Sequence, residues 1–302
     1  MEQHQNLTAR LQAAGIACRE QESLATHTTF KIGGPAAVFV QPADEAQLCQ
    51  AVRLCRELAV PCYLLGNGSN ILFGDRGYAG AVVSLAGMKG EVRREGNTLT
   101  APAGMPLSVL CTAALRAGLT GLEFAYGIPG TVGGAVYMNA GAYGGEMKDV
   151  LVSVRYLTAG GDIVEAPAAA LDLGYRRSVF ETNGGCILSA AVRLAPGNPE
   201  AIAARMDDLM GRRRDKQPLD KPSAGSTFKR PAGAFAGALI EQCGLRGYRH
   251  GGAAISEKHC GFVVNLGGAT CADVLALCAE VQKIVKEQTG FTLEKEIRVV
   301  EL

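Results

Sequence analysis

The sequence predicts a mixed α+β protein, and two patterns support this. A strand–helix–strand pattern runs through residues 36–65, which is typical of a parallel crossover. Two hairpin patterns follow in residues 80–104 and 151–166, and hairpins pair antiparallel strands. With further helices expected after residue 200, the chain of 302 residues is long enough for two or three domains.

The first 20 residues predict a short helix, because Leu7 and Leu11 recur at helical spacing. The crossover consists of strand-like runs at residues 36–40 and 60–65 with a helix between them. Asp44 is expected to cap the N-terminus of that helix, since a short acidic side chain can accept a hydrogen bond from the first turn. A glycine loop at residues 66–70 follows, at the strand end where α/β sheets usually bind ligands.

The hairpins are expected to turn at Gly96-Asn97 and at residues 160–162, where turn residues interrupt apolar runs. Residues 106–117 predict a helix and residues 186–194 a strand. The composition changes at residues 195–199, which predicts a domain boundary.

Beyond this boundary, residues 200–214, 235–243 and 271–288 predict helices. The chain then ends in a predicted strand, residues 293–300. Alternation along that strand places Glu294, Glu296 and Arg298 on one face, with Ile297 and Val299 on the other.

Composition and charge favour a cytoplasmic protein without nucleic-acid or membrane partners. The formal net charge is +1, no window of ~18 apolar residues occurs, and the N-terminus lacks the apolar region of a signal peptide. The ten cysteines include no C-x-x-C pair, which disfavours zinc and redox motifs. We expect buried free thiols, among them Cys271 and Cys278 on one helix face, and no metal site.

Glycine is concentrated between residues 127 and 145, together with apolar residues that a disordered linker would lack. Such backbone can approach a ligand closely, and its N–H groups can bind a diphosphate. A set of tight turns inside an ordinary core is the alternative. The loop at residues 66–70 favours a large nucleotide cofactor, but Ile71 replaces the third glycine of the dinucleotide fingerprint and no Walker A motif occurs.

Six segments, in this order, resemble the UDP-N-acetylenolpyruvoylglucosamine reductase family over nearly the whole chain. They are Thr28–Pro35, Leu65–Leu72, Gly127–Gly145, Tyr175–Phe180, Ser223–Lys229 and Leu293–Val299. The short connection between Tyr175 and Ser226 resembles the family's shorter class, which lacks a loop that places a tyrosine over the substrate.

The resemblance implies a two-lobed FAD-binding domain of the vanillyl-alcohol-oxidase type, followed by a smaller α+β substrate domain. We expect the lobes at residues 1–84 and 85–197 and the substrate domain at 198–302. It also implies non-covalent FAD and NADPH as reductant. Matching positions assign FAD contacts to Gly66, Asn67, Gly68, Ser69, Asn70, Gly130, Thr131, Gly133, Gly134 and Asn139.

In the implied reaction, hydride passes from NADPH to flavin N5 and then to C3 of UDP-N-acetylglucosamine enolpyruvate, while C2 receives a proton. Donors must meet the negative charge that develops at C2 and its carboxylate. The resemblance assigns Arg176 to the carboxylate, Ser226 to the proton, and Glu296 to the developing charge. The substrate contacts assigned with them are Tyr175, Lys229 and Asn265.

Each assignment has an alternative that the residues alone leave open. Arg176 could be half of a surface pair, Ser226 a helix N-cap, and Glu296 the solvent side of an edge strand. Glu294 is the rival for the role of Glu296, and Lys229 could be a surface lysine. At the level of function, the alternatives are an FAD-dependent small-molecule oxidase of the same flavin fold and a non-catalytic flavin or nucleotide sensor. We expect a monomer.

Overall fold

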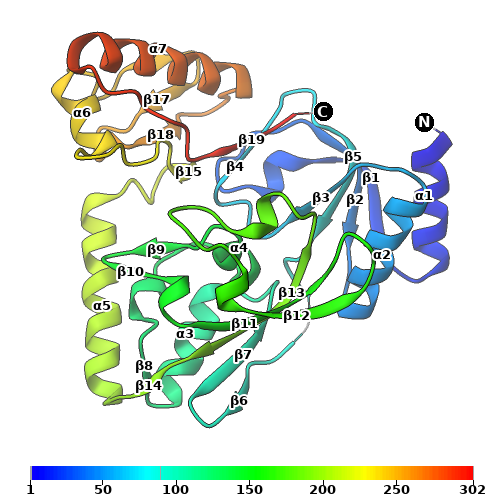
Figure 1. The fold of residues 1–302 in the computed structure, drawn as a ribbon. Helices are drawn as coiled ribbons and strands as arrows, with labels where there is room; N and C mark the ends of the chain where they lie inside the picture. Colours follow the sequence, from blue (N-terminus) through cyan, green and yellow to red (C-terminus); the bar gives the residue numbers. More distant parts are fainter. Residues whose placement is uncertain (1, 89, 302) are drawn as a thin grey trace. The chain divides into compact units, whose positions relative to one another are not determined.

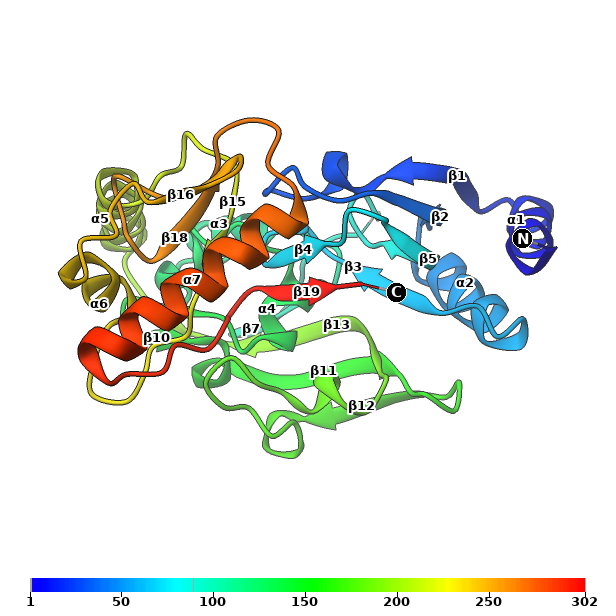
Figure 2. The same cartoon turned by 90° about the horizontal axis from the view of Figure 1, so that it is seen from above.

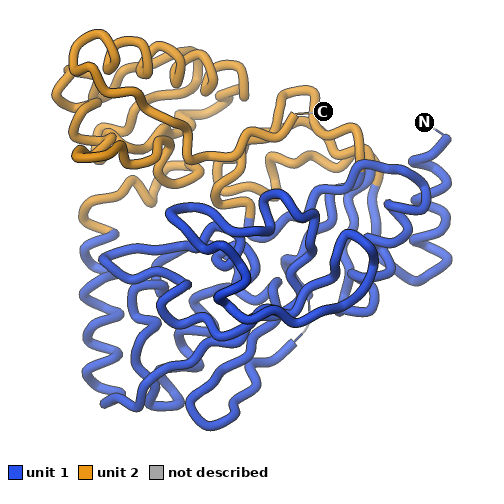
Figure 3. Tube along the Cα trace, in the orientation of Figure 1, with its two compact units in different colours: residues 1–19, 38–67, 81–213 blue, residues 20–37, 68–80, 214–302 orange. Residues whose placement is uncertain are grey.

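The computed structural model describes residues 2–88 and 90–301. They form two compact units, each built from separate stretches of the chain (Figure 3). Unit 1 contains residues 1–19, 38–67 and 81–213, and unit 2 contains residues 20–37, 68–80 and 214–302. The division into two lobes and a substrate domain stays a prediction, separate from these units.

The predicted N-terminal elements are confirmed, with one difference in connectivity (Figure 1). Helix α1 spans Glu2–Ala13 and buries Leu7 and Leu11, and helix α2 spans Glu45–Glu57. Asp44 caps α2, since its carboxylate accepts a hydrogen bond from the Gln47 N–H at 2.9 Å.

A four-stranded sheet has the order β1-β2-β5-β3. Its strands are β1 (Ala17–Ser23), β2 (Pro35–Gln41), β5 (Tyr78–Ser84) and β3 (Cys62–Leu65). Strand β3 pairs in parallel with β5. The two strands of the predicted crossover, β2 and β3, are therefore not neighbours, because a later strand lies between them.

A five-stranded sheet in unit 1 has the order β12-β11-β13-β7-β6 and is antiparallel throughout. Its strands are β6 (Arg93–Glu95), β7 (Thr98–Pro102), β11 (Leu151–Leu157), β12 (Ile163–Pro167) and β13 (Cys186–Arg193). The hairpin β11–β12 is confirmed, and β6–β7 turns at Gly96-Asn97 as predicted. Residues 80–84 of the first predicted hairpin instead belong to β5 of the four-stranded sheet.

Unit 1 also contains α3 (Leu107–Arg116), α4 (Val132–Tyr137) and most of α5 (Pro199–Lys216), whose last three residues belong to unit 2. Helix α4 packs against β13 and β7 of the five-stranded sheet. Short strands β8 (Leu119–Thr120) and β14 (Ala195–Pro196) pair with each other, as do β9 (Gly141–Ala142) and β10 (Gly145–Glu146). Unit 1 has a continuous apolar core of its own.

Unit 2 contains a second four-stranded sheet, in the order β15-β18-β17-β16. Its strands are β15 (Ser223–Ser226), β16 (Arg249–His250), β17 (Ala253–Ile255) and β18 (Phe262–Asn265). Helix α7 (Cys271–Thr289) packs on β16 and β17, and helix α6 (Ala236–Gln242) packs on α7 (Figure 2). These elements enclose a separate apolar core.

The predicted C-terminal strand is only partly correct. Strand β19 covers Arg298–Val300 and pairs in parallel with β4 (Ile71–Phe73) of the same unit. Residues 293–297 make a single bridge, between Lys295 and Phe228. Leu293 and Ile297, which the predicted alternation places on one face, are both buried, whereas Glu294 and Glu296 are not. The predicted strand is therefore wrong in its length, because only Arg298–Val300 pairs in a sheet.

Candidate functional site

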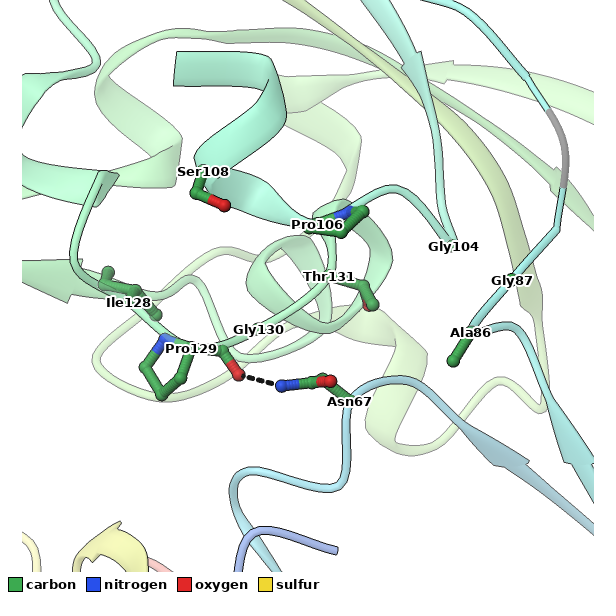
Figure 4. Close-up of a pocket in the computed structure, with 10 residues that line it drawn as sticks. All are labelled: Asn67, Ala86, Gly87, Gly104, Pro106, Ser108, Ile128, Pro129, Gly130 and Thr131. Carbon is green, nitrogen blue, oxygen red and sulfur yellow. Dashed lines mark hydrogen bonds between the residues drawn. The ribbon is translucent and has the colours of Figure 1, made fainter. Parts of the chain in front are cut away.

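Asn67 of the first glycine loop and Ile128–Thr131 of the second line one pocket in unit 1 (Figure 4). The pocket has a volume of about 180 Å³ and opens to solvent. It is lined by Asn67, Ala86, Gly87, Gly104, Pro106, Ser108, Ile128, Pro129, Gly130 and Thr131. The side-chain amide of Asn67 donates a hydrogen bond to the Pro129 carbonyl at 2.7 Å, which ties one loop to the other.

Local sequence explains why the loops come so close. Thr131 caps helix α4, because its hydroxyl accepts a hydrogen bond from the Gly134 N–H at 3.2 Å. A Cβ at Gly66 would lie 2.6 Å from that hydroxyl oxygen, so a larger residue there would displace the Thr131 side chain from its cap. The backbone of the first loop therefore passes directly beside the helix cap.

Gly133 serves packing of the protein itself. Its N–H donates to the Ala103 carbonyl at 2.8 Å, and a Cβ at this position would lie 2.8 Å from the Ala103 Cβ. The Gly134 N–H is likewise taken by the cap. These two N–H groups are thus engaged by protein acceptors, in contrast to the first loop.

Across the first loop, Asn67 through Asn70 donate no backbone hydrogen bond to any residue within 2–88 or 90–301. Four consecutive donors in an open loop are suited to an anion such as a diphosphate. Gly68 is held at a positive φ of 60°, and a Cβ there would lie 2.3 Å from the His27 carbonyl oxygen within unit 2. The residues present therefore fit the diphosphate of a nucleotide cofactor.

Asn139, predicted near that cofactor, has a completely buried side chain. Its amide nitrogen donates to Glu146 Oε2 at 2.6 Å and to the Gly174 carbonyl at 3.0 Å. Its amide oxygen accepts a hydrogen bond from the Lys148 N–H at 2.8 Å. Because both ends of the amide are bound to protein, we do not assign this side chain a direct contact with a ligand.

Arg176 lies at the tip of a tight turn in unit 1. Gly174 and Arg177 close the turn with reciprocal backbone hydrogen bonds of 3.0 and 3.2 Å. Arg176 has a φ of 55°, which is uncommon for a residue with a side chain. Its guanidinium is half-buried, donates to the Gly141 carbonyl at 3.2 Å, and lies 5.3 Å from the centre of the Tyr175 ring.

The neighbouring Arg177 has different surroundings from Arg176. Arg177 is exposed and forms an ion pair with Asp172 at 2.9 Å. Tyr175 is 53% exposed and so can offer its ring to a ligand. The alternative that residues 176 and 177 form one surface pair does not hold, because only Arg177 has that environment.

Ser226 ends strand β15 in unit 2 and pairs with Phe262 of β18. A register shift separates it from Ser223, and the intervening Gly225 has a positive φ of 75°. The alternative of a helix N-cap is excluded, because the following helix is capped at Phe235. Ser226 is half-buried at the end of this irregular strand.

Glu296 and Glu294 have different surroundings in unit 2. The Glu296 N–H donates to the Thr227 carbonyl at 2.8 Å, and the Glu296 carbonyl accepts from the Asn70 amide at 3.3 Å. This fixes the backbone of Glu296 next to the residue that follows Ser226. The Glu294 side chain is 73% exposed and lies 3.5 Å from the Lys229 ammonium.

Asn265 was expected to contact the substrate, but its amide is bound within unit 2. It is 6% exposed, its nitrogen donates to the Phe30 carbonyl at 3.2 Å, and its oxygen accepts from the Gly267 N–H at 2.8 Å. We therefore regard it as an anchor for two turns of this unit. Lys229, in contrast to the buried Asn265, forms a solvent-exposed ion pair with Glu294, and such pairs contribute little to stability.

The cysteines behave as expected from their spacing. All ten are free, and seven are buried. Burial raises the pKa of both the Cys271 and Cys278 thiols to about 12, so these side chains stay protonated within the core. Among residues 2–88 and 90–301, no group of three or more His, Cys, Asp or Glu side chains is arranged to hold a metal ion.

Within residues 2–88 and 90–301, no helix is both long enough and apolar enough to cross a lipid bilayer.

Sequence reasoning missed two kinds of residue. Isolated positions such as Gly104 and Ser108 line the pocket but lie outside any glycine run. Thr227 is buried, its hydroxyl accepts from the Val263 N–H at 2.9 Å, and its carbonyl holds Glu296. The signal available in the sequence was a hydroxyl residue directly after Ser226.

Two family models match the chain. The one described as "FAD binding domain" matches residues 36–167, and the one described as "UDP-N-acetylenolpyruvoylglucosamine reductase, C-terminal domain" matches residues 217–300. The first covers Asn67, Gly130 and Thr131 of the pocket, and the second covers Ser226 and Glu296.

Whole-chain relatives carry the same description. A UDP-N-acetylenolpyruvoylglucosamine reductase from Clostridium perfringens is 48% identical and spans 92% of this chain and 91% of the relative. Another, from Agathobacter rectalis, is 44% identical and spans 98% and 97%. Among solved structures, the UDP-N-acetylenolpyruvylglucosamine reductase from Thermus caldophilus aligns with a TM-score of 0.79 at 36% identity, covering 94% of this chain and 98% of that one. These matches confirm the predicted α+β fold with an FAD-type region and a distinct C-terminal domain.

Proposed function

This chain belongs to the UDP-N-acetylenolpyruvoylglucosamine reductase family, and we propose that it reduces UDP-N-acetylglucosamine enolpyruvate to UDP-N-acetylmuramate, using NADPH and non-covalent FAD. The observation that carries this proposal is the 48% identity to such a reductase over 92% of the chain. The product is a precursor of peptidoglycan. A cytoplasmic, monomeric enzyme is the simplest form of this activity.

The FAD diphosphate would be held by the backbone N–H groups of the loop at residues 66–70, with Thr131 lining the pocket beside Asn67. Gly130 would line the pocket without donating to the diphosphate, because its N–H already donates to the Ile128 carbonyl at 2.9 Å. Supporting this are the four backbone donors of the first loop and the pocket where it meets the second loop. When bound, FAD supplies the chemistry that carries hydride from NADPH to C3 of the substrate. Gly133 and Gly134 contribute indirectly, because their N–H groups fix helix α4 beside the pocket.

Arg176 would bind the substrate carboxylate. A planar guanidinium can form two parallel hydrogen bonds with a carboxylate. The reaction places extra negative charge on this carboxylate as C3 gains hydride, so the same contact strengthens in the transition state. Tyr175, exposed beside it, would pack against the substrate.

Ser226 would deliver the proton to C2, and Glu296 would donate a hydrogen bond from its protonated carboxyl to the developing charge. A serine hydroxyl is a weak acid, so it can act only on a strongly basic carbon or through a relay. The shared backbone contact through Thr227 supports joint action of the two residues. Lys229, in a weak exposed ion pair, would exchange Glu294 for the substrate diphosphate.

Oxygen-free turnover tests the proposal. The purified protein, supplied with NADPH and UDP-N-acetylglucosamine enolpyruvate, should consume the two in equal amounts and yield UDP-N-acetylmuramate by mass spectrometry. NADPH consumption that requires oxygen and yields peroxide would instead indicate an oxidase. Flavin that stays with the acid-precipitated protein would contradict the non-covalent assignment.

A further inference from the structure

The glycine-rich stretch, residues 127–145, lines the pocket and also forms hydrogen bonds with the turn that carries Arg176. The residues of the stretch that form these bonds are Tyr137, Asn139 and Gly141. The bonds, each given from donor to acceptor, are Ser178 Oγ to the Tyr137 carbonyl at 2.7 Å, Asn139 Nδ2 to the Gly174 carbonyl at 3.0 Å, and Arg176 Nη2 to the Gly141 carbonyl at 3.2 Å. All of these residues belong to unit 1. The segment next to the pocket therefore also carries the turn.

Among the three residues of the stretch, Asn139 alone contributes a side chain to these bonds. That side chain is completely buried, and its other partners are Glu146 Oε2 at 2.6 Å and the Lys148 N–H at 2.8 Å. Glu146 is itself fixed, because it forms a capping box with Asp149. The amide is thus a rigid bridge between an anchored turn and the Gly174 carbonyl.

The turn needs such a bridge. Arg176 adopts a φ of 55°, and a residue with a side chain keeps that conformation only where the surroundings enforce it. The reciprocal bonds between Gly174 and Arg177 close the turn but do not fix its direction. The hydrogen bond from Asn139 to the Gly174 carbonyl sets that direction from outside the turn.

We propose that Asn139 is a positioning residue for Arg176: its buried amide orients the Gly174–Arg177 turn so that the guanidinium points at the substrate carboxylate. This inference rests on the proposed function of Arg176. The glycine-rich stretch then has two roles, since Gly130 and Thr131 line the pocket and Asn139 holds the Arg176 turn. The position of the Arg176 guanidinium therefore depends on the segment beside the pocket.

Asn139→Gly is the informative variant. Asn139 has a φ of 40°, which glycine also adopts freely, so the substitution removes the amide without straining the backbone. Reduction of the flavin by NADPH should stay nearly unchanged. Reoxidation of the reduced enzyme by the enolpyruvate substrate should slow on the order of 100-fold, the effect expected from a misplaced group.

Asn198→Gly is the matched control. The Asn198 oxygen accepts a hydrogen bond from the Glu200 N–H at 2.8 Å at the start of α5, so its loss also weakens a local structure. No hydrogen bond links it to the Arg176 turn within the described residues. Both half-reactions should match the unsubstituted enzyme in this control.

A double-mutant cycle with Arg176→Ala separates positioning from general damage. If Asn139 acts through Arg176, then Asn139→Gly adds almost nothing once the arginine is gone. Additive losses would overturn the inference. Equal slowing of both half-reactions by Asn139→Gly would overturn it as well.

Asn139→Asp supplies a signature that damage to packing cannot produce. Its carboxylate would face the Gly174 carbonyl and the Glu146 carboxylate, which is paired with the Lys148 ammonium and capped with Asp149. The Lys148 N–H would still donate to position 139, but the donor to the Gly174 carbonyl would be lost and two carboxylates would lie together. Protonation at low pH restores one O–H donor, so substrate reduction by this variant should improve as the pH falls, relative to Asn139→Gly. A parallel pH response of both variants would contradict the inference.

These outcomes are distinct from failure of the proposed function. An unsubstituted enzyme that cannot reduce the substrate refutes the function and the inference together. An active enzyme in which Arg176→Ala is harmful but the losses are additive refutes the inference alone.

Discussion

Two glutamates, separated by one residue, show how surroundings decide a role. The Glu294 side chain is 73% exposed beside Lys229, whereas Glu296 is half-buried and bound through its backbone on both sides. The sequence favours Glu296 only by its place before Ile297 and Arg298. The structure adds a physical reason, since Glu296 lies beside the segment of Ser226.

We predict that Glu296→Gln slows substrate reduction strongly, by about 10²-fold or more, because the lost acid no longer meets the developing charge. Glu294→Gln is the matched control and should change the rate little, since it removes only a surface ion pair. Anaerobic reoxidation of the reduced enzyme by substrate measures both. The reverse ranking would exchange the two roles.

Ser226→Ala should leave flavin reduction by NADPH nearly intact and slow the substrate half-reaction by about 10²–10⁴-fold, the range for loss of a general acid. The hydroxyl ends strand β15, and alanine fits a strand end without steric conflict. Rapid-mixing absorbance of each half-reaction checks this. Equal slowing of both would make Ser226 a structural residue.

Arg176→Lys should also slow substrate reduction, because an ammonium cannot form the planar pair of hydrogen bonds with a carboxylate. The loss should appear as weaker substrate binding together with a lower rate. Steady-state kcat and KM for the enolpyruvate substrate, with NADPH saturating, measure it. Near-normal turnover would remove Arg176 from the mechanism.

At the scale of elements, helices and hairpins were predictable, because their signals are local. Asp44 at an N-terminus and the turn at Gly96 define ends regardless of tertiary context. The strand expected at residues 293–300 shows the opposite case. Alternation predicts a strand over the whole segment, but only Arg298–Val300 finds a pairing partner, in β4, and sequence alternation does not specify that partner.

Helix α4 provides a test at this scale. Gly133→Ala should destabilise the protein by about 1–3 kcal/mol, because its Cβ would meet Ala103 at 2.8 Å. Gly211→Ala is the control within α5, where a Cβ meets nothing within 4 Å. It should stabilise by about 0.5–1 kcal/mol. Thermal and denaturant unfolding compare the two, and equal effects would contradict this account of Gly133.

At the scale of the whole molecule, the sequence did not predict how the chain is shared between units. Residues 68–80 join the C-terminal part of the chain in unit 2 through the pairing of β4 with β19. Residues 20–37 join it through hydrogen bonds from the Ser223 N–H to the Thr29 carbonyl and from the Asn265 amide to the Phe30 carbonyl. Local periodicity contains no signal for such pairing. The resemblance to a family supplied Arg176 and Ser226, yet burial and hydrogen bonding were needed to distinguish Asn67 from Asn139.

The direct test of a flavin-dependent enolpyruvate reductase is anaerobic stopped flow on the yellow protein. We predict that NADPH bleaches the flavin absorbance and that UDP-N-acetylglucosamine enolpyruvate then restores it in full without oxygen, with one UDP-N-acetylmuramate formed per flavin. A reduced flavin that regains its colour only when oxygen is admitted would contradict the account.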